Sequence, residues 1–175
     1  MKRMDDLLDI DLQKKLRNNF LENGFILFPE FLNKEEITLV KNKLKEFIKE
    51  KVSTMPDNAV YYEAVEDKDT LKQLQRLFEF DPFFFDMMFG SRFEKLASIL
   101  LNDGVEGKNI QYFNKPPRIG KATPPHQDGY YFMLEPNEAV TMWMALEPVD
   151  KENGCVRYVN KSHRYGMRSH GRTST

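Results

Sequence analysis

The fold is organised around one stretch, Pro124-Pro125-His126-Gln127-Asp128-Gly129-Tyr130-Tyr131-Phe132, which sets an imidazole and a carboxylate two residues apart. In an extended segment, residues i and i+2 point to the same side, so His126 and Asp128 can converge while Gln127 turns away. Such a pair can hold two sites on a metal ion, as in the triad of two histidines and one carboxylate that binds non-haem Fe(II). The alternative is a hydrogen-bonded surface pair, because a His-x-Asp pattern also arises by chance.

Length and charge limit the class of protein. A chain of 175 residues fits a single domain, 1–175, with room for a sizeable core. Because 26 basic residues face 27 acidic ones, no net field attracts nucleic acid or an anionic membrane, and we expect a small-molecule substrate instead. No apolar run reaches the roughly 18 residues that a membrane-spanning helix needs.

The expected compartment is cytoplasmic. The single cysteine, Cys155, cannot form an internal disulfide. The start of the chain, Met1-Lys2-Arg3-Met4-Asp5-Asp6-Leu7-Leu8, lacks the apolar run of a signal peptide.

Residues 1–104 are predicted to be mainly helical. Apolar residues at helical spacing begin near Leu8 and stop at Gly24, and a short apolar strand is expected at 25–28. Further helices are expected where capping signals occur, as the paired residues Asn33 and Glu36, Asp81 and Pro82, and Ser91 and Glu94. The first of these helices should run to about residue 51. Leu71, Leu74, Leu77 and Phe78 also keep the helical period and predict a helical block from about residue 69.

Residues 105–175 are predicted to be mainly β. The period changes to two after Gly104, and strands are expected at 110–114, 130–134, 140–146 and 156–159, with a further short strand earlier at 60–65. Asn153-Gly154 can take the positive φ angles of a tight hairpin. A helical layer followed by an antiparallel sheet is an α+β arrangement.

Several motifs occur together in one order. They are Pro-His126-Gln-Asp128, the tyrosine-rich segment after it, Trp143, the run from Glu152 to Val159, and Ser162-His163-Arg164-Tyr165-Gly166. Read together, they resemble the phytanoyl-CoA dioxygenase family, closely over residues 110–166 and loosely over the helical half. One departure is Asn160-Lys161, where the family commonly has Pro-Gly, and it should alter the local turn.

The resemblance implies a fold, cosubstrates and site residues. The fold would be a helical N-terminal half packed on a double-stranded β-helix, or jelly roll, incomplete in this chain. The cofactor would be Fe(II), with 2-oxoglutarate and O₂ as cosubstrates in hydroxylation of a small organic molecule, and His126 and Asp128 would be metal ligands. Lys72, Gln111 and Trp143 would bind 2-oxoglutarate. An exposed lysine and a core tryptophan are the alternatives for Lys72 and Trp143.

The third metal ligand is not identified. In the family, the Ser-His of residues 162–163 belongs to a structural turn, and His170 lies on a polar end with no strand to position it, so neither is expected to bind iron. The family's distal histidine and the arginine that pairs with 2-oxoglutarate find no match, which predicts a C-terminally truncated chain. An open sheet edge would then favour self-association. The alternative is a non-catalytic jelly-roll binding module or an inactive homologue.

Overall fold

The computed structural model describes residues 7–170, and within that range the chain forms helices and one small antiparallel sheet. The α-helices are α1 (Ile10–Asn23), α2 (Lys34–Glu50), α3 (Leu77–Phe80), α4 (Pro82–Met88), α5 (Arg92–Leu101) and α6 (Asp128–Phe132). The strands are β1 (Val60–Tyr62), β2 (Leu71–Leu74) and β3 (Tyr112–Phe113), and the 3₁₀ turns are η2 (Val52–Thr54), η3 (Asp57–Ala59), η4 (Lys68–Thr70) and η5 (Ser162–Tyr165). The class is α+β, as predicted. The start of the chain and the last five residues of the polar run, which enter two predictions above, lie outside the described residues.

The helix boundaries follow the capping signals. Asn33 and Glu36 form the predicted capping box at α2, with both reciprocal bonds at 2.8 Å. Asp81 caps α4, which has Pro82 at its first position, and Ser91 caps α5. Short polar side chains satisfy the backbone N–H groups that a helix leaves unpaired at its start, so these boundaries are set locally.

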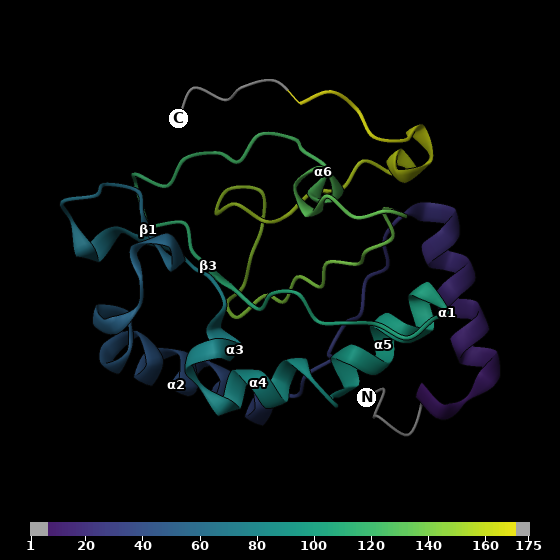
Figure 1. Ribbon diagram of the computed structural model, residues 1–175, viewed down its shortest axis with the longest axis horizontal. Helices are drawn as coiled ribbons and strands as arrows, with labels where there is room; N and C mark the ends of the chain where they lie inside the picture. The colour runs from purple at the N-terminus through teal and green to yellow at the C-terminus, as the bar shows by residue number, and fades with distance from the viewer. Residues whose placement is uncertain (1–6, 171–175) are drawn as a thin grey trace.

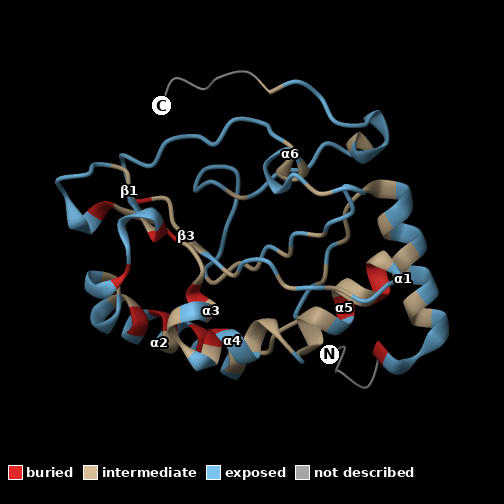
Figure 2. Ribbon diagram, in the orientation of Figure 1, coloured by how far each residue is buried: buried red, intermediate tan, exposed pale blue. Residues whose placement is uncertain are grey.

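The core lies in the first part of the chain (Figure 2). One cluster joins α2, α3, α4 and the sheet, and consists of Leu44, Phe47, Met55, Ala59, Leu74, Leu77 and Phe84. A second cluster involves α5, and consists of Leu7, Leu96, Ile99 and Leu100. Between residues 105 and 170 only Pro116 is buried. In Figure 1, α1 to α5 border the lower and right-hand sides, and the irregular second half lies across the other side.

The sheet, in the order β1-β2-β3, corrects one prediction. Residues 71–74 form the central strand rather than a helix, with Leu74 opposite Val60 on one side and Tyr112 on the other. The helical spacing of leucines was therefore misleading here, because strand pairing on both edges outweighs local propensity. Helix begins only at α3, after Arg76 takes a left-handed conformation with φ 57°.

The predicted strands are confirmed only in part. The segment at 130–134 falls largely in helix α6, and Met133 ends that helix with φ 52°. The segments at 25–28, 140–146 and 156–159 form no ladder within residues 7–170, while those at 60–65 and 110–114 shorten to β1 and β3. Alternating apolar residues show which side of a segment suits burial, but a strand also needs a partner for its N–H and C=O groups.

The turn containing η5 docks on the end of α1. The Lys161 N–H donates to Asn23 O at 2.9 Å, and His163 Nε2 lies 2.9 Å from Leu21 O, which can only accept. These donors satisfy carbonyls at the end of α1 that lack helical partners. Lys161 has φ 62°, a conformation that glycine adopts most readily, so the departure from the family's Pro-Gly falls at a left-handed position.

A charged network joins α2 and α5. Arg92 donates to the Glu36 carboxylate and, at 3.2 Å, to Phe31 O, and its guanidinium lies 5.5 Å from the centre of the Phe31 ring. Burial by itself would raise the pKa of Glu36, but the bond from the Asn33 N–H and the positive charge of Arg92 outweigh it, so the pKa is lowered. The charged form of Glu36 therefore stabilises the fold.

Gly24→Ala tests the docked turn. Gly24 has φ 82°, and a methyl group added there would overlap the His163 ring, whereas Gly90 has φ 66° with open space around it. We expect Gly90→Ala to lower the unfolding free energy by about 1–2 kcal/mol through backbone strain alone. Gly24→Ala should cost roughly 1–3 kcal/mol more, because the bonds from residues 161 and 163 are lost as well. Urea unfolding of both variants measures the difference, and equal losses would contradict the docking.

Arg92→Met tests the network through its pH dependence. The folded pKa of Glu36 lies below its unfolded value, so its stabilisation is complete above the unfolded pKa and disappears as pH falls through the folded one. We expect the variant to lose about 1 kcal/mol at neutral pH and the loss to shrink in acid. The control, Lys43→Met, removes an exposed pair with Glu46 on α2 and should change the unfolding midpoint far less. A loss that does not vary with pH would rule out the Glu36 interaction as its source.

Candidate metal centre

His126 and Asp128 converge as their spacing predicts. Gln127, between them, is extended, with φ −115° and ψ 119°, and Asp128 is the first residue of α6. His126 Nε2 lies 3.0 Å from Asp128 Oδ1, with 38% and 42% of the two side chains exposed. The pair is therefore open to an ion from solvent.

In each side chain, the polar atom that faces away from the other residue, His126 Nδ1 or Asp128 Oδ2, makes a hydrogen bond. His126 Nδ1 lies 2.9 Å from Pro124 O, which can only accept, so Nδ1 carries a proton and Nε2 is the atom that faces the carboxylate. On the other side, Thr141 Oγ1 donates to Asp128 Oδ2 at 2.7 Å, which leaves Oδ1 facing the imidazole.

This donor set fits a divalent metal ion. Two ligands at adjacent positions of an octahedral ion, each about 2.1 Å from it, are about 3 Å apart. Imidazole nitrogen and carboxylate oxygen are also ligand types that Fe(II) accepts. The same separation suits an ion pair when His126 is protonated, which corresponds to the alternative of a surface pair.

Aromatic rings lie beside the pair. Tyr131 and His126 pack in a T-shaped arrangement at 6.1 Å between centroids, and Tyr130 stacks on His170 at 4.1 Å with an interplanar angle of 19°. His170 Nε2 accepts the Gln127 N–H at 2.9 Å, and its Nδ1 lies 2.8 Å from Arg168 O. Both ring nitrogens of His170 are thus engaged beside the site rather than directed at it.

Gln127 turns away from the pair, as expected, and holds a distant segment. Its side-chain Nε2 donates to Gly166 O at 3.0 Å, and its Oε1 accepts the Arg168 N–H at 2.8 Å. Together with the backbone bond to His170, these contacts tie residues 166–170 to the residue between the two candidate ligands.

No third ligand joins the pair within residues 7–170. That range holds no group of three His, Cys, Asp or Glu residues arranged to bind a metal ion. His163 lies at the end of α1, where its ring packs on Gly24.

The predicted 2-oxoglutarate residues lie in different surroundings. Lys72 Nζ is 3.6 Å from Glu63 Oε1, and only 5% of the Glu63 side chain is exposed. Gln111 accepts a bond from Gln73 at 2.8 Å. Lys72 is skipped where the pairing of β1 with β2 shifts register, and no contact among the described residues brings Lys72 and Gln111 together.

Trp143 is 44% exposed and follows Thr141 by two residues on the segment that reaches Asp128. It is not a fully buried core residue. The roles of Lys72, Gln111 and Trp143 toward 2-oxoglutarate stay predictions.

Two residues at the site were not found from the sequence. Thr141 lies 13 residues after Asp128 and donates a hydrogen bond to it. The Tyr158 ring stacks on Phe25 at 5.4 Å between centroids. Burial around its hydroxyl raises the pKa of Tyr158, and the negative charge of Asp128 raises it further, so the phenol stays protonated at neutral pH. Tyr158 lies in the run from Glu152 to Val159, but neither that run nor the sequence around Thr141 indicates that these residues lie near Asp128, because the path of the chain places them there.

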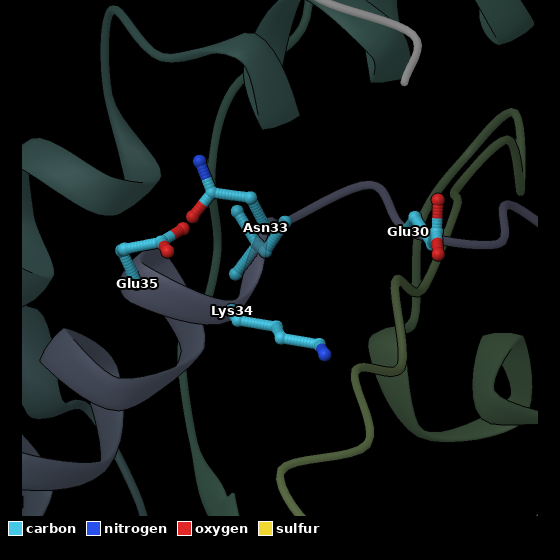
Figure 3. Close-up of a pocket in the computed structure, with 5 residues that line it drawn as sticks. Glu30, Asn33, Lys34 and Glu35 are labelled. Atoms are coloured by element: carbon cyan, nitrogen blue, oxygen red, sulfur yellow. The ribbon is translucent and has the colours of Figure 1, made fainter.

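A surface hollow lies elsewhere, at the start of α2 (Figure 3). It is lined by Glu30, Leu32, Asn33, Lys34 and Glu35, and the ammonium end of Lys34 extends into it. It shares no residue with the His126–Asp128 pair, and we assign it no chemistry. Among the helices of residues 7–170, none is long and apolar enough to cross a membrane.

Several curated proteins are similar to this chain in sequence. The chain is 25% identical over 180 residues to phytanoyl-CoA dioxygenase 1 of Oryza sativa subsp. japonica, covering 85% of this chain and 64% of that protein. It is 26% identical over 181 residues to phytanoyl-CoA dioxygenase of Arabidopsis thaliana, with the same coverage. It is 25% identical over 163 residues to the peroxisomal phytanoyl-CoA dioxygenase of Mus musculus, covering 88% of this chain and 48% of that protein. The chain thus spans about half to two-thirds of the length of these relatives.

No solved structure matches the chain. The sequence model of the phytanoyl-CoA dioxygenase (PhyH) family, in contrast, matches residues 20–175, which include the helices from α2 to α6 and the His126–Asp128 pair. The chain therefore belongs to the phytanoyl-CoA dioxygenase family.

Proposed function

We propose that the chain is part of an Fe(II)- and 2-oxoglutarate-dependent dioxygenase that hydroxylates a small organic molecule. Family membership implies dioxygenase-type chemistry. The observation that supports the metal is the 3.0 Å separation of His126 Nε2 and Asp128 Oδ1, with the outer atom of each group held by a hydrogen bond. When bound, iron and 2-oxoglutarate would supply the oxidation of a C–H bond by O₂.

The chain's own residues would bind and orient the reactants. His126 would ligate through Nε2, since Nδ1 donates to Pro124 O, and Asp128 would ligate through Oδ1 and offset part of the positive charge of the metal ion. Lys72, Gln111 and Trp143 would contact 2-oxoglutarate. For Lys72, this requires that its ammonium leave or share the Glu63 carboxylate, which it approaches at 3.6 Å.

We further propose that the third ligand and the remaining strands of the jelly roll come from polypeptide that corresponds to the additional length of the relatives. The sheet of residues 7–170 has β1 and β3 at its edges, where further strands or a second copy of the chain could pair. Further strands could also pair with residues 140–146 and 156–159, which form no ladder within residues 7–170.

A second candidate function is a non-catalytic binding module on the same fold. The observation that favours it is that residues 7–170 hold two metal-ligand side chains at the site rather than three. Both candidates take a small molecule, because the near-balanced charge of the chain gives no attraction to nucleic acid or membrane surfaces.

Metal binding separates the two candidates. We expect the chain to bind Mn(II), used as a stable substitute for Fe(II), and Asp128→Ala to weaken that binding by at least about tenfold, because it removes a ligand. The control is Asp86→Ala, which removes an exposed carboxylate from α4 and should leave the affinity unchanged. Electron paramagnetic resonance of free Mn(II) measures the affinity, and circular dichroism checks the fold. Equal affinities of wild type and Asp128→Ala would favour the binding module.

Turnover depends on the complete ligand set. With Fe(II) and 2-oxoglutarate, we expect the 175-residue chain to release little succinate, and a version extended by the corresponding C-terminal part of a relative to release more. Succinate measured by mass spectrometry compares the two versions, and the extended one carrying His126→Ala is the control. Vigorous succinate release by the 175-residue chain would show that it needs no further ligand.

A further inference from the structure

We propose that Thr141 is a positioning residue, whose hydroxyl holds Oδ2 of Asp128 so that Oδ1 stays turned toward His126 Nε2. The inference rests on the proposed function, in which these two atoms bind the metal ion. Nothing in the His-x-Asp motif specifies this residue, which lies 13 positions after the aspartate.

The contact selects one oxygen of the carboxylate. Thr141 Oγ1 donates to Oδ2 at 2.7 Å, while Oδ1 lies 3.0 Å from His126 Nε2. The Pro124 carbonyl does the equivalent for the imidazole by accepting from Nδ1 at 2.9 Å. Each side chain is therefore fixed through its outer atom, and the inner atoms of both face one another.

Local structure alone would not fix Asp128. It begins α6, a helix of only five residues, and Gln127 before it makes no side-chain capping bond. Its side chain is 42% exposed, so water can solvate either oxygen if the carboxylate rotates. A carboxylate that rotates must be ordered when metal binds, and the lost conformational freedom lowers the affinity.

A second contact, between Asn137 and Gly129, holds the segment that carries Thr141 near the start of α6. Asn137 Nδ2 donates to Gly129 O at 2.9 Å, and a Cβ at residue 129 would lie 2.7 Å from Asn137 Oδ1. The loop that leaves α6 is thus closely packed back on the start of that helix. Thr141 lies four residues after Asn137 on this segment, and its hydroxyl reaches Asp128.

The test compares Thr141→Val, which keeps the side-chain shape but loses the donor, with Thr141→Ser, which keeps the donor. We expect Thr141→Val to weaken Mn(II) binding by about tenfold, in the range found for groups that hold a metal ligand in place. Thr141→Ser should bind within about threefold of wild type, because it retains the hydroxyl. The matched control is Thr54→Val, since Thr54 is exposed and donates to Lys51 O away from the site. Unchanged affinity in Thr141→Val, with Asp128→Ala impaired, would overturn the role of Thr141 and leave the metal pair intact.

A measurement without metal keeps the two proposals separate. The Hα–Hβ couplings of Asp128 in the NMR spectrum report whether its side chain holds one rotamer. We expect one rotamer in wild type and Thr141→Ser, and rotamer averaging in Thr141→Val. If no variant binds Mn(II), the proposed function is refuted. Rotamer averaging in Thr141→Val would still support the role of Thr141 in holding the Asp128 side chain. Couplings that match wild type in Thr141→Val would overturn the inference.

Discussion

The burial of Leu74, on the central strand β2, is the constraint on which the rest of the structure depends. Leu74 is fully buried, lies opposite Val60 and Tyr112, and shares a cluster with Phe47 of α2 and Phe84 of α4. Truncation of a side chain at such a position costs about 2–5 kcal/mol. Because β3 leads directly into the loop that carries the candidate ligands, this packing also fixes where that loop begins.

The sequence predicted the helices best where a boundary is set by short-range bonds. Asn33 with Glu36, Asp81 and Ser91 each cap a helix through bonds that span no more than three residues, and the Asp81 side chain accepts from the Phe83 N–H. The leucines at 71, 74 and 77 failed as a guide, because helical spacing also fits a strand followed by a helix. Which of the two forms depends on Val60 and Tyr112, which are distant in the chain.

In the candidate site, too, the residues that the sequence predicted are those placed by local structure, and the residues that it missed are placed by distant contacts. His126 and Asp128 could be found because the conformation of a single residue, Gln127, decides whether they converge. Thr141 and Tyr158 could not, because their places depend on how the loops after α6 return to it. The predicted strand at 130–134 failed for a related reason. Tyrosine and phenylalanine favour strands in general, but the segment pairs with no strand of residues 7–170 and forms one helical turn instead.

The contacts of Gln127 have a consequence for how the chain folds. They join positions 39 to 43 residues apart, whereas the helices and their caps form from neighbouring residues. Closing a long loop costs entropy before its contacts form, so such contacts are made after local ones. We therefore expect the helical core to be in place before the loop around His126 and Asp128 becomes ordered, and the ability to hold a ligand to be among the last properties that the chain gains as it folds.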